Sequence, residues 1–377
     1  MKKLVSLVLF AVFLSGIAYS IQVLDIGSLS DKLKEIRKAN LQLLEARYWT
    51  AMDDKNVQCQ LCPNYCFLPV GKKGRCGNRI NVDGKLYTLV YARPVAVHID
   101  PIEKKPFTHF LPGTTSFSIA TAGCNLGCLF CQNWQISQAR PEDAQSVVLV
   151  PEQVVDLAIK SKSASIAYTY TEPTVFYEYM FDTAKLAKQR GLKNVMHTCG
   201  YINAKPLMEL LQYMDAVNVD LKGFSEEYYA TMSSGRLEPV LETIKNVKRA
   251  GVWLEITNLV VPGKNDDPKM IKAMSVWIRD NAGADTPLYF SAFNPMYKLT
   301  SVPPTPVETL EKARKIARDA GLHYVYIGNV YGNAGESTYC PNCGKLLVKR
   351  QGFDTLQVDV IDGKCKYCGY KIAGVWK

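Results

Sequence analysis

The chain alternates between short apolar runs and longer amphipathic segments, and this alternation limits the possible folds more than any other feature. The pattern predicts strands over 116–121, 166–170, 195–199, 216–221, 252–261, 287–292 and 323–327, and helices over 151–162, 174–190, 203–213, 239–250, 268–281 and 305–320. Strands separated by helices of this length form βα units and a parallel sheet. We therefore expect an α/β fold, a partial or full (β/α) barrel, with functional residues at the carboxyl ends of its strands.

The first of these strands leads into three closely spaced cysteines, Cys124, Cys128 and Cys131, which we call the cysteine triad. No fourth cysteine follows nearby, whereas a zinc site normally uses four protein ligands. A cubane iron–sulfur cluster has four irons, so three thiolates leave one iron open for a substrate or cofactor. The spacing Cys-x3-Cys-x2-Cys therefore predicts a [4Fe-4S] cluster. The alternative is a structural metal knuckle completed by a distant cysteine.

This spacing after a strand resembles the signature of radical S-adenosylmethionine (radical SAM) enzymes. The resemblance implies that the open iron binds the amino and carboxylate groups of SAM. It also implies that an electron from the cluster splits the sulfonium, and that the resulting 5′-deoxyadenosyl radical removes a hydrogen from the substrate. SAM and an electron donor such as ferredoxin or flavodoxin are the partners that this chemistry requires.

Eight of the other cysteines form two further groups, whose CxxC-like spacing indicates metal binding rather than disulfides. The N-terminal cysteine set consists of Cys59, Cys62, Cys66 and Cys76, and the tail cysteine set of Cys340, Cys343, Cys365 and Cys368. Four thiolates can close a metal site completely, and the spacing of the N-terminal set leaves zinc and a second iron–sulfur cluster equally open. The tail set has the two CxxCG knuckles of a zinc ribbon, so zinc with a structural role is expected there.

From about Leu44 onward, the order of several motifs resembles one family. These motifs are CQLCPNYC, GRCGNR, DPIEKKPFTHFLPG, GCNLGCLFCQNWQISQ, YTYTEPT, VNVDLKGF, VPGKNDD and the tail CPNCG…CKYCGYKIAGVW. Together they are similar to the radical SAM enzyme of the AmmeMemoRadiSam system, a relative of the pyruvate formate-lyase activating enzyme. The resemblance adds a protein substrate, or the other members of that system, as candidate partners.

The resemblance also implies a SAM-binding role for Tyr170, Thr171 and Glu172, which occupy the place of the Gly-Gly-Glu-Pro motif of relatives. Main-chain carbonyls of that motif accept hydrogen bonds from the SAM ammonium, and a carbonyl does not depend on its side chain. The alternative for Glu172 is an N-cap for the helix that begins near Thr174.

Further candidates for SAM binding stand at other strand ends. Asp220 and Lys222 match a segment near SAM in the activating enzymes, where the lysine would pair with the SAM carboxylate; the alternative is a surface salt bridge. Thr198 belongs to a strand-end Thr-x-Gly, and Asn258 ends a strand. Asn294 stands where relatives are expected to carry histidine, and asparagine can still donate a hydrogen bond.

Three residues receive no binding role from the sequence. We expect His197 to be an ordinary strand residue and Cys199 to be a small buried hydrophobe. His109 has no assignable role.

The net charge of +10 is spread over scattered lysines, such as Lys104 and Lys105, without a basic block. This distribution favours a solvated surface over a nucleic-acid groove, so we expect no nucleic-acid partner. Two alternative functions remain: an activase of a glycyl-radical enzyme, and a zinc-knuckle protein that binds nucleic acid without catalysis.

The chain begins with Lys2 and Lys3, an apolar run from Leu4 to Ala18, and a possible cleavage site at Ala18-Tyr19-Ser20. Residues 1–20 therefore have the form of a secretory signal, with an uncleaved membrane anchor as the alternative. This segment predicts a membrane-associated or exported protein, whereas a need for cytosolic SAM favours the cytoplasm. Beyond it we expect a helix over 28–52, the N-terminal set and a hairpin over 81–98 (together 28–110), the barrel core (111–330) and a zinc-ribbon-like module (335–377).

Overall fold

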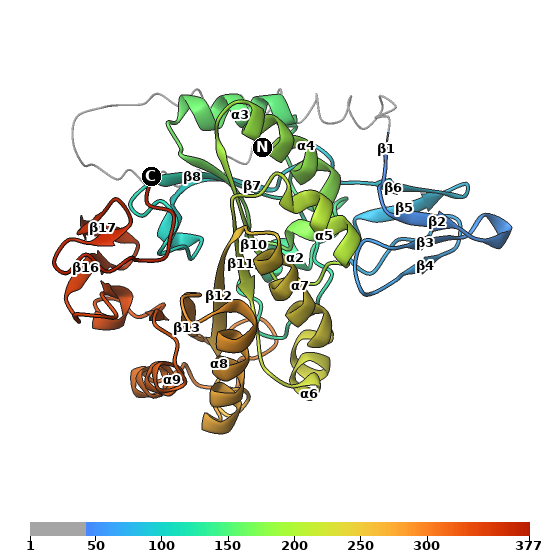
Figure 1. The fold of residues 1–377 in the computed structure, drawn as a ribbon. Helices are drawn as coiled ribbons and strands as arrows, with labels where there is room; N and C mark the ends of the chain where they lie inside the picture. Colours follow the sequence, from blue (N-terminus) through green and yellow to red (C-terminus); the bar gives the residue numbers. More distant parts are fainter. Residues whose placement is uncertain (1–42) are drawn as a thin grey trace, which may run out of the picture. The chain divides into compact units, whose positions relative to one another are not determined.

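The computed structural model of the protein describes residues 43–377 (Figure 1). The expected signal or anchor, and most of the helix expected over 28–52, lie outside the described residues. Residues 44–377 form one compact unit. No helix within the described part of the chain is long and apolar enough to cross a membrane.

The unit is built on an eight-stranded sheet with the order β14-β13-β12-β11-β10-β9-β8-β7. Its strands are β7 (Ala96–Pro101), β8 (Thr115–Ala120), β9 (Ser165–Tyr168), β10 (Lys193–Thr198), β11 (Ala216–Asp220), β12 (Trp253–Val260), β13 (Leu288–Ala292) and β14 (Val325–Gly328). Strands β8 to β14 pair in parallel, which confirms the expected α/β fold. Strand β7 pairs antiparallel with β8 at the edge, whereas the sequence had placed this segment in the hairpin.

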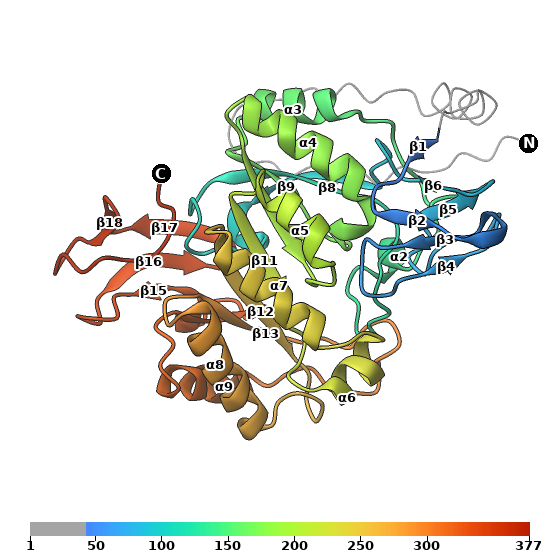
Figure 2. The ribbon, with the colours of Figure 1, turned by 45° about the vertical axis from the view of Figure 1, so that its right-hand side comes forward.

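Six long helices cover one face of this sheet (Figure 2). They are α3 (Pro151–Lys160), α4 (Tyr177–Gln189), α5 (Ala204–Leu211), α7 (Glu238–Arg249), α8 (Pro268–Ala282) and α9 (Val307–Asp319). Helix α8 shows how such a helix begins and ends. At its start the Asp267 side chain accepts a hydrogen bond from the main-chain N–H of Lys269, and at its end Gly283 adopts φ 99°. Val240, Ile244 and Val247 of α7 recur at helical spacing and are fully buried in the core.

Two shorter helices and several single turns complete the helical elements of residues 43–377. These are α2 (Trp134–Ser137), α6 (Glu226–Tyr228), the 3-10 turns η1 (Asp53–Lys55), η2 (Ile102–Lys104), η3 (Pro173–Phe176) and η5 (Ala334–Glu336), and the π-turn η4 (Tyr229–Ser233).

The N-terminal module consists of two small sheets, with the orders β1-β6-β5 and β2-β3-β4. Their strands are β1 (Leu44–Glu45), β2 (Trp49–Ala51), β3 (Val57–Cys59), β4 (Phe67–Leu68), β5 (Arg79–Val82) and β6 (Lys85–Thr88). The expected hairpin is confirmed for β5 and β6, which join at Asp83 and Gly84 with φ of 50° and 88°. The prediction of a helix over 28–52 is wrong for residues 43–52, the part of this range that the structure describes. Tyr48 has φ 58°, which a right-handed helix does not allow, and strands lie on both sides of it.

The tail folds into two small antiparallel sheets, β15-β16-β17 and β18-β19. Their strands are β15 (Thr338–Tyr339), β16 (Leu346–Gln351), β17 (Asp354–Val358), β18 (Val360–Ile361) and β19 (Lys364–Cys365). Buried polar contacts join the tail to the core: His109 Nδ1 lies 2.5 Å from the Ala373 carbonyl oxygen, and Arg350 donates to the Thr108 carbonyl at 2.7 Å. The other ring nitrogen of His109, Nε2, lies 2.6 Å from the hydroxyl of Tyr326 in β14. His109, which had no role in the sequence, therefore connects the core to the tail.

Candidate active site

A cavity of about 1090 Å³ opens at the carboxyl ends of the parallel strands. The cysteine triad lines it, together with residues that follow β9, β10 and β11, such as Tyr170, Cys199 and Lys222. In βα folds these strand ends meet on one side of the sheet, which is where ligands bind. The volume lies at the upper end of the range of roughly 300–1,000 Å³ for small-molecule sites, so the cavity has room for a cofactor and a substrate together.

The loop that carries the triad leaves β8 through Gly123, which has φ 93°. A Cβ atom at this position would lie 2.4 Å from the Asn78 Oδ1 and 2.7 Å from the Cys76 carbonyl oxygen. Only glycine allows so close an approach between this loop and the N-terminal module.

The three sulfurs of the triad lie in a polar, largely buried environment. The main-chain N–H of Leu126 donates to the Cys124 sulfur at 3.4 Å, and the Ser137 hydroxyl lies 3.1 Å from the Cys131 sulfur. Burial raises the pKa of the Cys128 thiol to about 12, so a thiolate there needs a nearby positive charge. Three thiols with these properties in one loop fit an iron–sulfur cluster, which the triad would hold.

Cys199 is not merely a buried hydrophobe, because its thiol lines the cavity and donates a hydrogen bond to Cys124. This hydrogen bond lowers the pKa of Cys124 and raises the pKa of Cys199. Cys199 therefore interacts directly with a cysteine of the triad.

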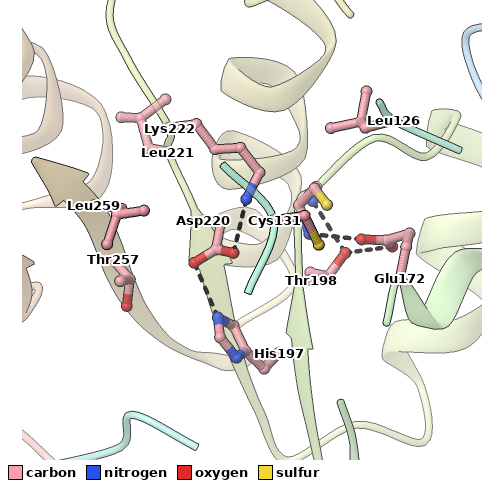
Figure 3. A network of polar contacts seen from close by, with 12 residues as sticks. Leu126, Cys131, Glu172, His197, Thr198, Asp220, Leu221, Lys222, Thr257 and Leu259 are labelled. Carbon is pink, nitrogen blue, oxygen red and sulfur yellow. Dashed lines mark hydrogen bonds and ion pairs between the residues drawn. The ribbon is translucent and has the colours of Figure 1, made fainter. Parts of the chain in front are cut away.

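Glu172 ties two neighbouring strand ends together (Figure 3). Its carboxylate accepts hydrogen bonds from the Thr174 main-chain N–H at 3.1 Å, the Thr198 hydroxyl at 2.7 Å and the Cys199 main-chain N–H at 2.6 Å. The first of these caps η3, as the alternative interpretation of Glu172 expected. Its side chain is thus committed to positioning the loops after β9 and β10.

Tyr170 adopts the left-handed conformation, with φ 63°, at a position where relatives are expected to carry glycine. Its side chain is fixed by two contacts: the hydroxyl donates to the Asp100 carboxylate, and Lys105 Nζ lies 4.0 Å from the ring centroid. The Asn133 side chain donates a hydrogen bond through Nδ2 to the Tyr170 carbonyl at 2.8 Å. A carbonyl oxygen has two lone pairs, so the Tyr170 carbonyl can accept a second hydrogen bond.

Lys105 belongs to the cavity rather than to the solvated surface that the sequence indicated. Its side chain is 1% exposed, and Nζ pairs with the Asp100 carboxylate at 2.6 Å. Burial lowers the pKa of Lys105 to about 8, although Asp100 opposes this shift.

Asp220 lies between Lys222 and His197 at the end of β11 (Figure 3). Its carboxylate is 3.0 Å from Lys222 Nζ and 2.9 Å from His197 Nε2. Burial by itself would lower the pKa of Lys222, but the charge of Asp220 outweighs burial and raises it well above the usual value. Lys222 is only 12% exposed, so the interpretation as a surface salt bridge is wrong, and His197 is not an ordinary strand residue.

Asn258 is the one residue predicted to bind SAM that does not line the cavity. Its neighbours Thr257 and Leu259 line the cavity, and successive side chains of a strand point to opposite faces. Asn258 therefore points away, where Nδ2 donates to the Leu221 carbonyl at 2.7 Å. Asn294 and Thr171 do line the cavity, as expected.

Part of the cavity lining comes from the tail and includes Arg350, Gly352, Phe353 and Asp354. Sequence reasoning gave this module only a structural role, because nothing in its motifs indicates which side of the core it packs against. The tail therefore takes part in shaping the cavity.

The tail cysteine set has the geometry of a metal site. The sulfurs of Cys340 and Cys368 are 3.7 Å apart, and those of Cys343 and Cys365 are 3.8 Å apart. All four sulfurs lie within 4.8 Å of one another.

The chain is similar to several known proteins. The family model for the radical SAM superfamily matches residues 118–274. An uncharacterized protein from Methanocaldococcus jannaschii is 48% identical over 330 residues, which are 87% of this chain and 98% of that protein. The pyruvate formate-lyase-activating enzyme of Clostridium pasteurianum is 22% identical over 167 residues, 42% of this chain and 67% of that enzyme.

Among solved structures, a radical SAM methyltransferase from Sphaerobacter thermophilus aligns with a TM-score of 0.46 and 13% identity, covering 86% of this chain and 88% of that one. The family match begins within β8 and covers the triad and the strand ends through β12. The chain belongs to the radical SAM superfamily and is an enzyme of that class.

Proposed function

We propose that the cysteine triad binds a [4Fe-4S] cluster and that the enzyme cleaves SAM reductively, so that a hydrogen is abstracted from a substrate in the same cavity. The observation that carries this proposal is the convergence of the triad, a buried lysine and a free carbonyl lone pair on one cavity. When bound, the cluster supplies one low-potential electron and one iron without a protein ligand.

The residues of the chain would bind and orient SAM. Lys222 stays protonated beside Asp220 and offers its charge to the SAM carboxylate, while His197 fixes Asp220 from the other side. The Tyr170 carbonyl accepts from the SAM ammonium, and Asn294 donates from the rim. Glu172 and Thr198 hold the loops that carry these groups.

Exchange of one triad cysteine tests the proposal. After anaerobic reconstitution, Cys128→Ala should lose the visible absorbance that the triad's cluster contributes and should produce no 5′-deoxyadenosine from SAM. Cys199→Ala is the matched control in the same cavity, and it should keep the cluster. If Cys128→Ala forms 5′-deoxyadenosine at the wild-type rate, the assignment of the triad is wrong.

The substrate is the finer part of the proposal. The order of the motifs supports the radical SAM enzyme of the AmmeMemoRadiSam system. The similarity to the Clostridium activating enzyme favours a second candidate, an activase that forms a radical on a protein glycine. Genes next to this one distinguish the two: a glycyl-radical enzyme supports the activase, and the other system members support the first candidate.

We further propose that the tail cysteine set holds one structural zinc. Tetrahedral zinc with Zn–S bonds of about 2.3 Å separates its sulfurs by about 3.8 Å. The measured separations of 3.7 and 3.8 Å support this assignment.

A further inference from the structure

The N-terminal cysteine set surrounds a second, smaller cavity next to the loop of the triad. All four of its cysteines line this cavity, together with Arg79 and Asn125. Its volume is about 20 Å³, and about 10–15 Å³ is enough for a water molecule. The four cysteines thus share the lining of one small cavity.

The distances between sulfurs distinguish this set from the tail set. The four tail sulfurs lie within 4.8 Å of one another, as a single tetrahedral ion requires. Among the described residues no other group of three cysteine sulfurs is so compact, so both the N-terminal set and the triad are more widely spaced. Around a cluster each thiolate binds a different iron, which places the sulfurs farther apart than around one ion. Like the triad, the N-terminal set is therefore more widely spaced than the tail set, as thiolates around a cluster are.

The surroundings of the N-terminal set suit a group with net negative charge. The main-chain N–H of Arg75 donates to the Cys66 sulfur at 3.5 Å, and Arg79 Nη1 donates to the Cys59 sulfur at 3.6 Å. The Arg79 side chain is 1% exposed and also pairs with the buried Glu178. A buried guanidinium and a main-chain donor directed at sulfur offset the charge of four thiolates.

We propose that Cys59, Cys62, Cys66 and Cys76 bind a second iron–sulfur cluster of the [4Fe-4S] type, and not zinc. Four protein ligands leave none of its irons open, so this cluster does not bind SAM.

The second cluster would lie beside the first. The Asn64 side chain donates to the Asn125 carbonyl at 2.8 Å, and the Asn78 side chain donates to the Ala122 carbonyl at 2.7 Å. Asn125 lines the smaller cavity and directly follows Cys124 of the triad. The two cysteine loops are therefore in direct contact.

A variant without the triad isolates the proposed site. The full chain with Cys124→Ala, Cys128→Ala and Cys131→Ala would be purified anaerobically and reconstituted with iron and sulfide. We expect about four irons and four labile sulfides per chain, together with about one zinc from the tail set. About two zincs per chain with no labile sulfide would overturn the proposal.

A second variant changes the N-terminal set and keeps the triad, so the proposal can be tested even if the triple variant fails to fold. Cys62→Ala with Cys66→Ala, in a chain with an intact triad, should lower the iron content from about eight to about four per chain. Iron that stays at the wild-type level would contradict the second cluster. The test is independent of the proposed function: a triad that binds no cluster would leave the wild type and the triple variant with the same four irons.

Discussion

At the scale of single residues, the cavity is organised by buried charges that are paired with each other. Lys222 and His197 share Asp220, and Lys105 pairs with Asp100 while it packs on Tyr170. Buried charges without partners are costly, so each of these pairs fixes the position of a group at the cavity wall. Lys105 and Lys222 therefore both offer a positive charge to an anionic ligand in the cavity.

Replacement of Lys222 by alanine should weaken SAM binding by about 1–3 kcal/mol, because a charged hydrogen bond to the SAM carboxylate is lost. This corresponds to a rise in Kd of about 5- to 150-fold. Anaerobic equilibrium dialysis with SAM measures it, and iron analysis should find the cluster unchanged. Lys222→Arg keeps the charge and serves as the control. Equal SAM affinity in the wild type and Lys222→Ala would leave Lys222 only the role of partner to Asp220.

His109 should make stability depend on pH. Burial lowers its pKa to about 3, against an ordinary value of 6.5. Between these values the unfolded chain binds a proton at His109 that the folded chain does not, so stability is lost as the pH falls from 6.5 towards 3. The loss amounts to at most about 5 kcal/mol for this one group.

Urea unfolding of the wild type and His109→Gln at pH 7.5 and pH 5 checks this prediction. The free energy of unfolding should fall more steeply in the wild type, because the variant lacks the titrating group and keeps every other one. Parallel loss of stability in the two proteins would contradict it.

Among the strands and helices, the sequence predicted those whose periodicity was long and regular. Six βα repeats were found because apolar residues recur every second or every third to fourth position. The element over 44–52 was misjudged since Leu44 and Tyr48 are four residues apart, which imitates a helix, although Tyr48 has φ 58°. Asn258 was placed on the wrong face because its strand is buried on both sides, and a shift of one residue then reverses the direction of every side chain.

We expect the tail strands to depend on the zinc proposed for the tail cysteine set. Cys343→Ala should lose the zinc of the full-length protein and lower its thermal stability, because zinc binding and folding of such modules are coupled. Cys199→Ala, outside the tail set, is the control and should keep one zinc. Zinc analysis and calorimetry together test this prediction. One zinc per chain in Cys343→Ala would show that the tail set is not its ligand.

For the molecule as a whole, the sequence identified the triad and most of the strand ends, because motif residues next to a parallel strand must meet at one edge of the sheet. It did not identify Lys105, His197 or Arg350 as members of the cavity. Their positions depend on how segments far apart in the chain pack. Arg350, for example, donates a hydrogen bond to the carbonyl of Thr108, which lies 242 positions earlier in the sequence. Pairings of this kind leave no local pattern in the sequence.

The position of the tail also has a consequence for biosynthesis. The triad and the strands around it leave the ribosome long before Arg350 and Asp354, which complete the lining of the cavity. Folding during synthesis proceeds from the N-terminus. A nascent chain would therefore expose its three thiols before the tail completes the cavity lining, and insertion of iron and sulfide at that stage would precede packing of the tail.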